Sequence, residues 1–127
     1  MSGLRTSALL CVVLLVLARP AAASDEIYNV FAGCAGRFSA EMEHAWLMGD
    51  AAADEYESQR HTFISLTEAA IPAEKTRAVL HHRLDHKLAH ASLLTIATFG
   101  QDDRRARAAR SAAKAYRQAC EQLLLRG

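Results

Sequence analysis

The stretch that decides the fold is residues 27–45, IYNVFAGCAGRFSAEMEHA. Its apolar residues recur every three or four positions, which is the period of an α-helix with one buried side. The inward positions that this spacing predicts are Ile27, Phe31, Cys34, Phe38, Met42 and Ala45. Ser24 can cap the start of this helix, and Gly49 followed by Asp50 is typical of its end.

Three further helical segments follow, and no alternating strand pattern accompanies them. The second begins at Asp50 and breaks at Ile71-Pro72, because proline cannot continue a helix. The third runs from about residue 73 to Phe99, with Gly100 as its stop, and Asp102 caps the fourth. The inner positions predicted for the second helix are Tyr56, Phe63, Leu66 and Ala70. Those predicted for the fourth helix are Ala109, Ala112, Ala113, Tyr116, Cys120 and Leu123. Short connections then predict an all-α fold, an up-down-up-down four-helix bundle.

Residues 1–23 have the organisation of a signal peptide. Arg5 supplies the positive charge, Ala8–Ala18 (ALLCVVLLVLA) an apolar core too short to span a bilayer, and Ala21–Ala23 a small-residue cleavage site. Because Cys11 lies inside that core, we do not expect a lipoprotein. The expected product is one helical domain, residues 24–127, periplasmic or secreted and without a transmembrane segment. The alternative is an uncleaved N-terminal anchor.

The charge of the chain argues against nucleic acid as a partner. Its 15 Lys and Arg residues face 14 Asp and Glu residues, and loss of Arg5 and Arg19 would leave 13 bases and a formal charge of −1. A near-neutral exported domain lacks the basic surface that nucleic acids require. Residues 24–74 hold ten acids and two arginines, whereas residues 75–127 hold eleven bases and four acids. We therefore expect the two halves to present complementary charges to each other within one fold.

The two cysteines of the expected mature chain support the bundle. Cys34 lies near the start of the first helix and Cys120 near the end of the fourth, each on the predicted inward stripe. In an antiparallel bundle these two positions have the same height, and an exported protein meets an oxidising environment. We therefore predict a Cys34–Cys120 disulfide. Two buried free thiols, or a metal-bound pair, are the alternatives.

Four of the six histidines lie in residues 81–90, HHRLDHKLAH. On a helix, Leu80, Leu84, Leu88, Ala91 and Thr95 line one side, while His82, His86 and His90 fall together on roughly the opposite side. Histidines four residues apart can share Zn, Cu or Ni, with a fourth ligand from His61, His44 or Glu43 on another helix. The same histidines are alternatively amphipathic boundary residues, or a cluster that responds to mildly acidic pH. No other cofactor is expected.

Residues 88–99, LAHASLLTIATF, are apolar almost all round the helix. A peripheral helix of an isolated bundle does not need a second apolar side. Homodimerisation, or a protein partner, would bury Leu93 and Ile96 on that side. Uneven packing of the helices within one chain would also bury both sides.

No catalytic motif is present in the sequence. It lacks a G-x-S-x-G elbow, a glycine-rich phosphate loop and a C-x-x-C pair, and Gly33-Cys34-Ala35-Gly36 lies in mid-helix. Glu41-Met-Glu-His44 is one Glu-x-x-His unit, but the following helices offer no second unit for a di-iron centre. We therefore expect a non-enzymatic protein with no catalytic or cofactor-binding residues.

The segments CAGRFSAEMEHAWLM (34–48) and LAHASLLTIATF (88–99), with a late cysteine before LLL, resemble those of uncharacterised small exported helical proteins of alphaproteobacteria. The resemblance covers most of the expected mature chain. It implies an exported helical bundle and no function. The favoured hypothesis is a structural or interaction protein of the periplasm or exterior, and the alternative is a metal-binding protein built on His82, His86 and His90.

Overall fold

The structure is a computed structural model that describes residues 26–126. These residues form α2 (Ile27–Met48), α3 (Ala53–Ala70), the 3-10 turn η1 (Ala73–Lys75), α4 (Thr76–Phe99) and α5 (Asp103–Leu125), and they contain no strand. The prediction of an all-α chain with four helices is confirmed. None of the helices in this range is long and apolar enough to cross a membrane. The predicted signal peptide, residues 1–23, and the predicted cap Ser24 lie outside the described residues.

The helix ends follow the local chemistry of the sequence. Gly49 ends α2 in the left-handed conformation, with a φ of 67°, which glycine adopts without steric cost. The extended Ile71 and Pro72 separate α3 from η1, so the third segment begins as a 3-10 turn. Asp102 caps α5, because its Oδ1 accepts a hydrogen bond of 3.0 Å from the amide of Arg105. The predicted boundaries at Gly49, Pro72 and Asp102 are therefore confirmed, whereas the predicted start at Asp50 is wrong, because α3 begins at Ala53.

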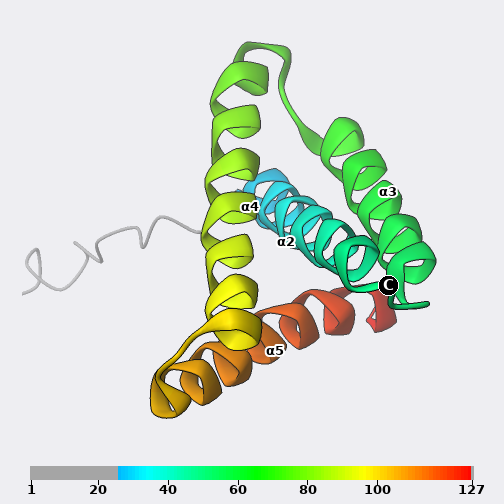
Figure 1. Cartoon of the computed structure of the whole chain (residues 1–127). Coiled ribbons are helices and arrows are strands. Elements are labelled where there is room, and N and C mark those ends of the chain that lie inside the picture. The colour runs from blue at the N-terminus through cyan, green and yellow to red at the C-terminus, as the bar shows by residue number, and fades with distance from the viewer. Residues whose placement is uncertain (1–25, 127) are drawn as a thin grey trace, which may run out of the picture.

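Helix α2 lies at the centre of the molecule, with α3 packed on one side and α4 on another (Figure 1). The backbones of α3 and α4 run in opposite directions and do not approach each other anywhere in residues 26–126. Helix α5 crosses the end of α4 instead of running alongside it, and it meets α2 over a short stretch. The helices are thus a bundle organised around α2.

Because α2 is covered on two sides, it buries more than a single stripe. Its buried residues are Tyr28, Ala32, Gly33, Cys34, Ala35, Gly36, Phe38, Ser39, Ala40, Glu41, Met42 and Ala45. Ile27 was expected inside but is 52% exposed, whereas its neighbour Tyr28 is buried. The main apolar cluster joins α2 to α3, where the rings of Phe38 and Phe63 stack with centroids 5.7 Å apart. Burial of such aromatic pairs is a large part of the stability of a small domain.

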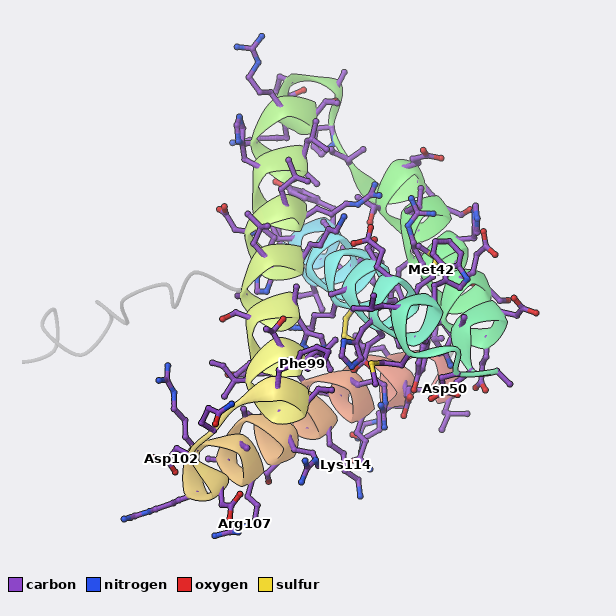
Figure 2. The ribbon with its side chains drawn as sticks, in the orientation of Figure 1. Met42, Asp50, Phe99, Asp102, Arg107 and Lys114 are labelled. Carbon is purple, nitrogen blue, oxygen red and sulfur yellow. A yellow bond between two sulfur atoms is a disulfide. The ribbon has the colours of Figure 1, made fainter. Side chains whose placement is uncertain are left out.

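The predicted disulfide is confirmed. Cys34 and Cys120 are joined with their Cα atoms 5.6 Å apart, and both residues are buried against Phe38 and Phe63. The side chains around this core are drawn in Figure 2, with sulfur in yellow. Since α5 otherwise meets α2 only briefly, the disulfide fixes the end of α5 to the first half of α2.

Two glycines of α2 allow α4 to come close. A Cβ atom built on Gly36 would lie 2.2 Å from the carbonyl oxygen of Arg83, and 3.0 Å from the amide nitrogen of Lys87. Both atoms belong to the backbone of α4, so no side-chain movement could relieve the overlap. At Gly33 the nearest atom is in the ring of His86, at 3.3 Å. The crossing of α2 and α4 therefore requires glycine at position 36.

This crossing turns the histidine side of α4 toward α2 and the leucine side outward. His90 is buried, whereas Leu80, Leu84 and Leu88 are 51%, 44% and 67% exposed. Leu93 and Ile96 are half-buried within the chain, as the alternative of uneven helix packing predicted. The face of α4 left for a partner is therefore the leucine stripe, defined as Leu80, Leu84 and Leu88.

We predict that Gly36→Ala destabilises the protein by about 1–3 kcal/mol, because the added methyl group overlaps the backbone of α4. Gly33→Ala is the matched comparison, since its new methyl group would meet only a histidine ring that can rotate. Urea unfolding of the two variants measures the difference. If both variants lose the same stability, the contact between position 36 and the backbone of Arg83 does not limit how closely α2 and α4 approach each other.

Candidate functional site

A ladder of polar pairs connects α2 to α4. From α2, Arg37 contacts His86, Glu41 contacts His90, Glu43 contacts Lys87 and His44 contacts Thr98. The close crossing at Gly36 sets the register of these pairs, because it fixes which residues of α4 face α2. Of the complementary charges expected between the two halves of the chain, Glu43 and Lys87 meet here, and Glu41 also lies 3.7 Å from Arg117 of α5.

The pair of Glu41 and His90 is the most buried of these. The side chains are 6% and 1% exposed, and Nε2 of His90 lies 2.8 Å from Oε1 of Glu41. A carboxylate can only accept, so Nε2–H donates to Glu41. By contrast, the 2.6 Å pair of Lys87 and Glu43 is 30% and 48% exposed. The two pairs belong to the same helix interface but differ in their access to water.

Arg117 of α5 adds a positive charge beside Glu41. Its Nη1 lies 3.7 Å from Oε1 of Glu41 and donates a 3.1 Å hydrogen bond to the hydroxyl of Tyr56 on α3. Its Nε lies 3.3 Å from Oε1 of Glu121. Burial raises the pKa of Tyr56, and the charge of Arg117 partly offsets that shift. Arg117 thus links α5 to α2 and α3 and has two carboxylates as partners.

Arg37 of α2 occupies a different environment. Its Nη2 donates to Nδ1 of His86 at 3.2 Å, its Nη1 donates to Sγ of Cys120 at 3.7 Å, and its Cζ lies 5.0 Å from the centroid of the Tyr116 ring. Because arginine can only donate, Nδ1 of His86 must accept. Burial lowers the pKa of the Arg37 guanidinium, an effect that Tyr116 partly offsets. Within residues 26–126, no carboxylate forms an ion pair with Arg37.

A cavity of about 190 Å³ lies beside Arg37 and His90. It is lined by Arg37, His86, Ala89, His90, Leu93 and Tyr116, and is called the Arg37 cavity below. Nδ1 of His90 is buried and has no hydrogen-bond partner. A buried ring nitrogen without a partner costs free energy, because it has lost its contact with water.

The structure does not bring the three predicted metal ligands together. The rings of His82 and His86 have centroids 4.4 Å apart, but Nε2 of His90 is engaged by Glu41. The candidate fourth ligands are also dispersed: Glu43 pairs with Lys87, His44 contacts Thr98, and His61 on α3 lies 3.8 Å from Glu57. Across residues 26–126, no group of three or more His, Cys, Asp or Glu side chains is placed to hold a metal ion.

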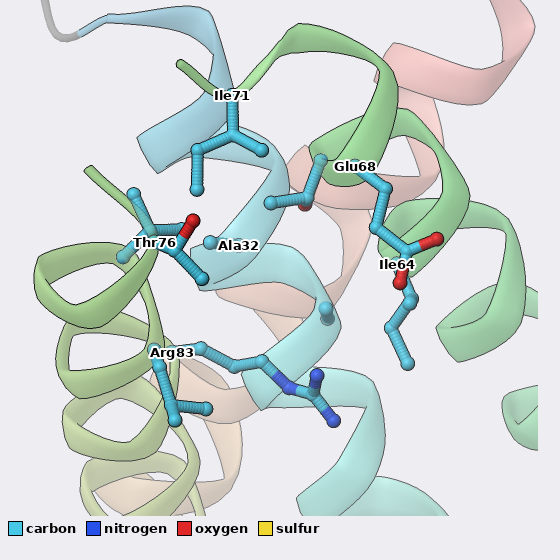
Figure 3. Close-up of a pocket in the computed structure, with 10 residues that line it drawn as sticks. Ala32, Ile64, Glu68, Ile71, Thr76 and Arg83 are labelled. Carbon is cyan, nitrogen blue, oxygen red and sulfur yellow. The ribbon is translucent and has the colours of Figure 1, made fainter. Parts of the chain in front are cut away.

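An apolar pocket of about 180 Å³ opens between α3 and α4, with α2 as its floor (Figure 3). Ala32 lies on the floor, Ile64 and Ile71 on the side of α3, and the extended side chain of Arg83 on the side of α4. Burial and the nearby charge of Arg60 lower the pKa of Arg83, and Glu68 partly offsets both effects. Leu80 also lines the pocket. The leucine stripe and the pocket therefore adjoin each other at Leu80.

Three residues of the polar cluster have roles that the sequence did not predict: Arg37 and Arg117 were not singled out, and Glu41 was considered only as part of a Glu-x-x-His unit. A signal for two of them exists in hindsight. Arg37 and Glu41 are four residues apart and follow the Gly33/Gly36 pair, which marks a close helix approach. Charged side chains next to such a close approach are buried when the two helices pack against each other.

Comparisons of this chain with protein-family models, with curated proteins and with solved structures find no match. The arguments about its function therefore rest on the residues and their geometry.

We predict that Glu41→Ala destabilises the protein by about 1–3 kcal/mol, because it leaves the buried Nε2–H of His90 without an acceptor and leaves Arg117 with Glu121 as its carboxylate. Glu43→Ala is the matched control, on the same helix and at the same interface. Its partly exposed pair with Lys87 should contribute less than about 1 kcal/mol. Chemical denaturation of both variants measures the two losses. If Glu43→Ala costs as much as Glu41→Ala, burial does not decide the strength of these pairs.

Proposed function

We propose that this chain is a non-enzymatic exported protein that works through protein–protein contact, and that it forms a homodimer through the leucine stripe of α4. Export is inferred from the signal-peptide pattern of residues 1–23 and agrees with the Cys34–Cys120 disulfide. The proposal assigns no catalytic residue.

The observation that carries the proposal is the inverted orientation of α4. A surface helix normally turns its charged residues to water and its leucines to the core. Here Leu80, Leu84 and Leu88 lie on the outside, while His90 is buried. Leucines four residues apart fall on one side of a helix, and together with the adjoining pocket they form an apolar patch. Such patches are typical of contact surfaces.

A second copy of the chain is the partner that the charges on this face fit. On α4, Arg77 lies about one turn before Leu80 on the same side of the helix, Asp85 follows Leu84, and the two charges lie eight residues apart. In a twofold antiparallel pairing centred near His81, each Arg77 would approach Asp85 of the second copy. The same pairing would place leucines of both copies in one apolar seam. Two α4 helices paired in this way would run in opposite directions, as neighbouring helices of an up-down bundle do. Within one chain α5 is not such a neighbour of α4, because it crosses the end of α4.

Metal binding by His82, His86 and His90 is not our proposal. The carboxylate of Glu41 engages the ring nitrogen of His90, and the guanidinium of Arg37 donates to the ring of His86. A cation beside the histidines opposes Zn, Cu or Ni through charge repulsion.

We predict that Leu84→Glu weakens dimerisation at least about tenfold, because it places a carboxylate within the apolar seam. Leu125→Glu is the matched control, since Leu125 is 86% exposed and lies on α5, outside the proposed interface. Sedimentation velocity over a range of concentrations measures the association of each variant.

The proposal fails if the unmodified protein is still monomeric at about 100 μM, where an interface worth about 5.5 kcal/mol would be half assembled. Equal weakening by Leu125→Glu would place the contact elsewhere on the molecule.

A further inference from the structure

We propose that the Arg37 cavity binds a small oxyanion, a carboxylate or phosphate group, between the guanidinium of Arg37 and the imidazole of His90. The cavity lies on the inward side of α4, away from the leucine stripe. The inference therefore does not depend on the dimer.

The first support is the unbalanced charge of Arg37. Arg117 lies near Glu41 and Glu121, whereas the acceptors of Arg37 are a ring nitrogen and a disulfide sulfur. These contacts use two of the five N–H groups of a guanidinium. A partly buried cation is costly without a counter-ion, and a bound anion would supply one.

The second support is the ring of His90. This residue is 2% exposed, and its Nδ1 has no partner. Nε2 is held by Glu41, and the two nitrogens of an imidazole point in nearly opposite directions, so Nδ1 is directed away from that carboxylate. In the tautomer that donates Nε2–H to Glu41, Nδ1 carries a lone pair and needs a donor, which the O–H group of hydrogen phosphate, or a water molecule bound together with a carboxylate, would supply.

The third support is the space between these groups. Arg37 and His90 line the same cavity of about 190 Å³, together with His86 and Tyr116. This volume exceeds what a single water molecule needs. Tyr116 is 48% exposed, so this side of the cavity reaches solvent and gives a ligand a route of entry.

The chemistry of the lining selects an anion over other ligands. The planar fork of a guanidinium matches the oxygens of a carboxylate or phosphate. A metal cation would be repelled by Arg37, and an uncharged apolar molecule would leave Arg37 and His90 unpaired. Ala89 and Leu93 add a small apolar wall to the cavity.

Isothermal titration of the purified protein with sodium phosphate, and separately with sodium acetate, tests this inference. Sodium chloride keeps the ionic strength constant. We expect one ion bound per chain. Saturation by phosphate alone identifies a tetrahedral oxyanion as the ligand class, and saturation by acetate identifies a carboxylate. If neither ion binds, the proposal is wrong.

Arg37→Gln should weaken binding at least about tenfold, because it removes a charge-assisted hydrogen bond. Arg104→Gln, an exposed arginine at the start of α5, is the matched control and should bind as the unmodified protein does. If Arg37→Gln folds poorly, Arg37→Lys keeps the charge but loses the fork, and it should also bind less tightly. Unchanged affinity in the Arg37 variants, or equal loss in Arg104→Gln, would overturn the assignment.

Discussion

The rest of the structure depends on one contact between backbones, where Gly36 of α2 meets Arg83 of α4. The absent side chain lets the two helices approach so closely that a methyl group would lie 2.2 Å from a carbonyl oxygen. This approach fixes the rotation of α4 about its axis. Once the rotation is fixed, the histidines must find partners on α2, and the leucines of the opposite side must face outward.

The interior that results combines an apolar cluster with a polar one. Toward α3, the rings of Phe38 and Phe63 and the disulfide form a core without charges. Toward α4 and α5, Glu41 is surrounded by His90 and Arg117, and Arg37 lies beyond them. Buried ion pairs add little net stability compared with apolar residues, but losing one partner is costly. Such a cluster therefore favours a single arrangement of α4 and α5, because any other would leave charges without partners.

The sequence was sufficient for the features that depend on local chemistry. The ends at Gly49, Pro72 and Asp102 follow from glycine, proline and capping rules, and the pairing of Cys34 with Cys120 follows from helix order and compartment. The rotation of α4 could not be obtained in this way, because both of its sides carry apolar residues and the choice between them is made by α2. The partners of His86 and His90 were missed for the same reason. The crossing of α5 over α4 likewise depends on packing between distant segments.

The bond between Cys34 and Cys120 has a consequence for the durability of the chain. It closes a covalent ring across a sequence separation of 86 residues, and the three connections between helices, near residues 49–52, 71–75 and 100–102, all lie inside that ring. A protease that cuts any one of these loops opens the ring but releases no fragment. The nicked molecule keeps every helix tethered, so its pieces can dock again in place. This connectivity keeps the molecule in one piece after a first cleavage.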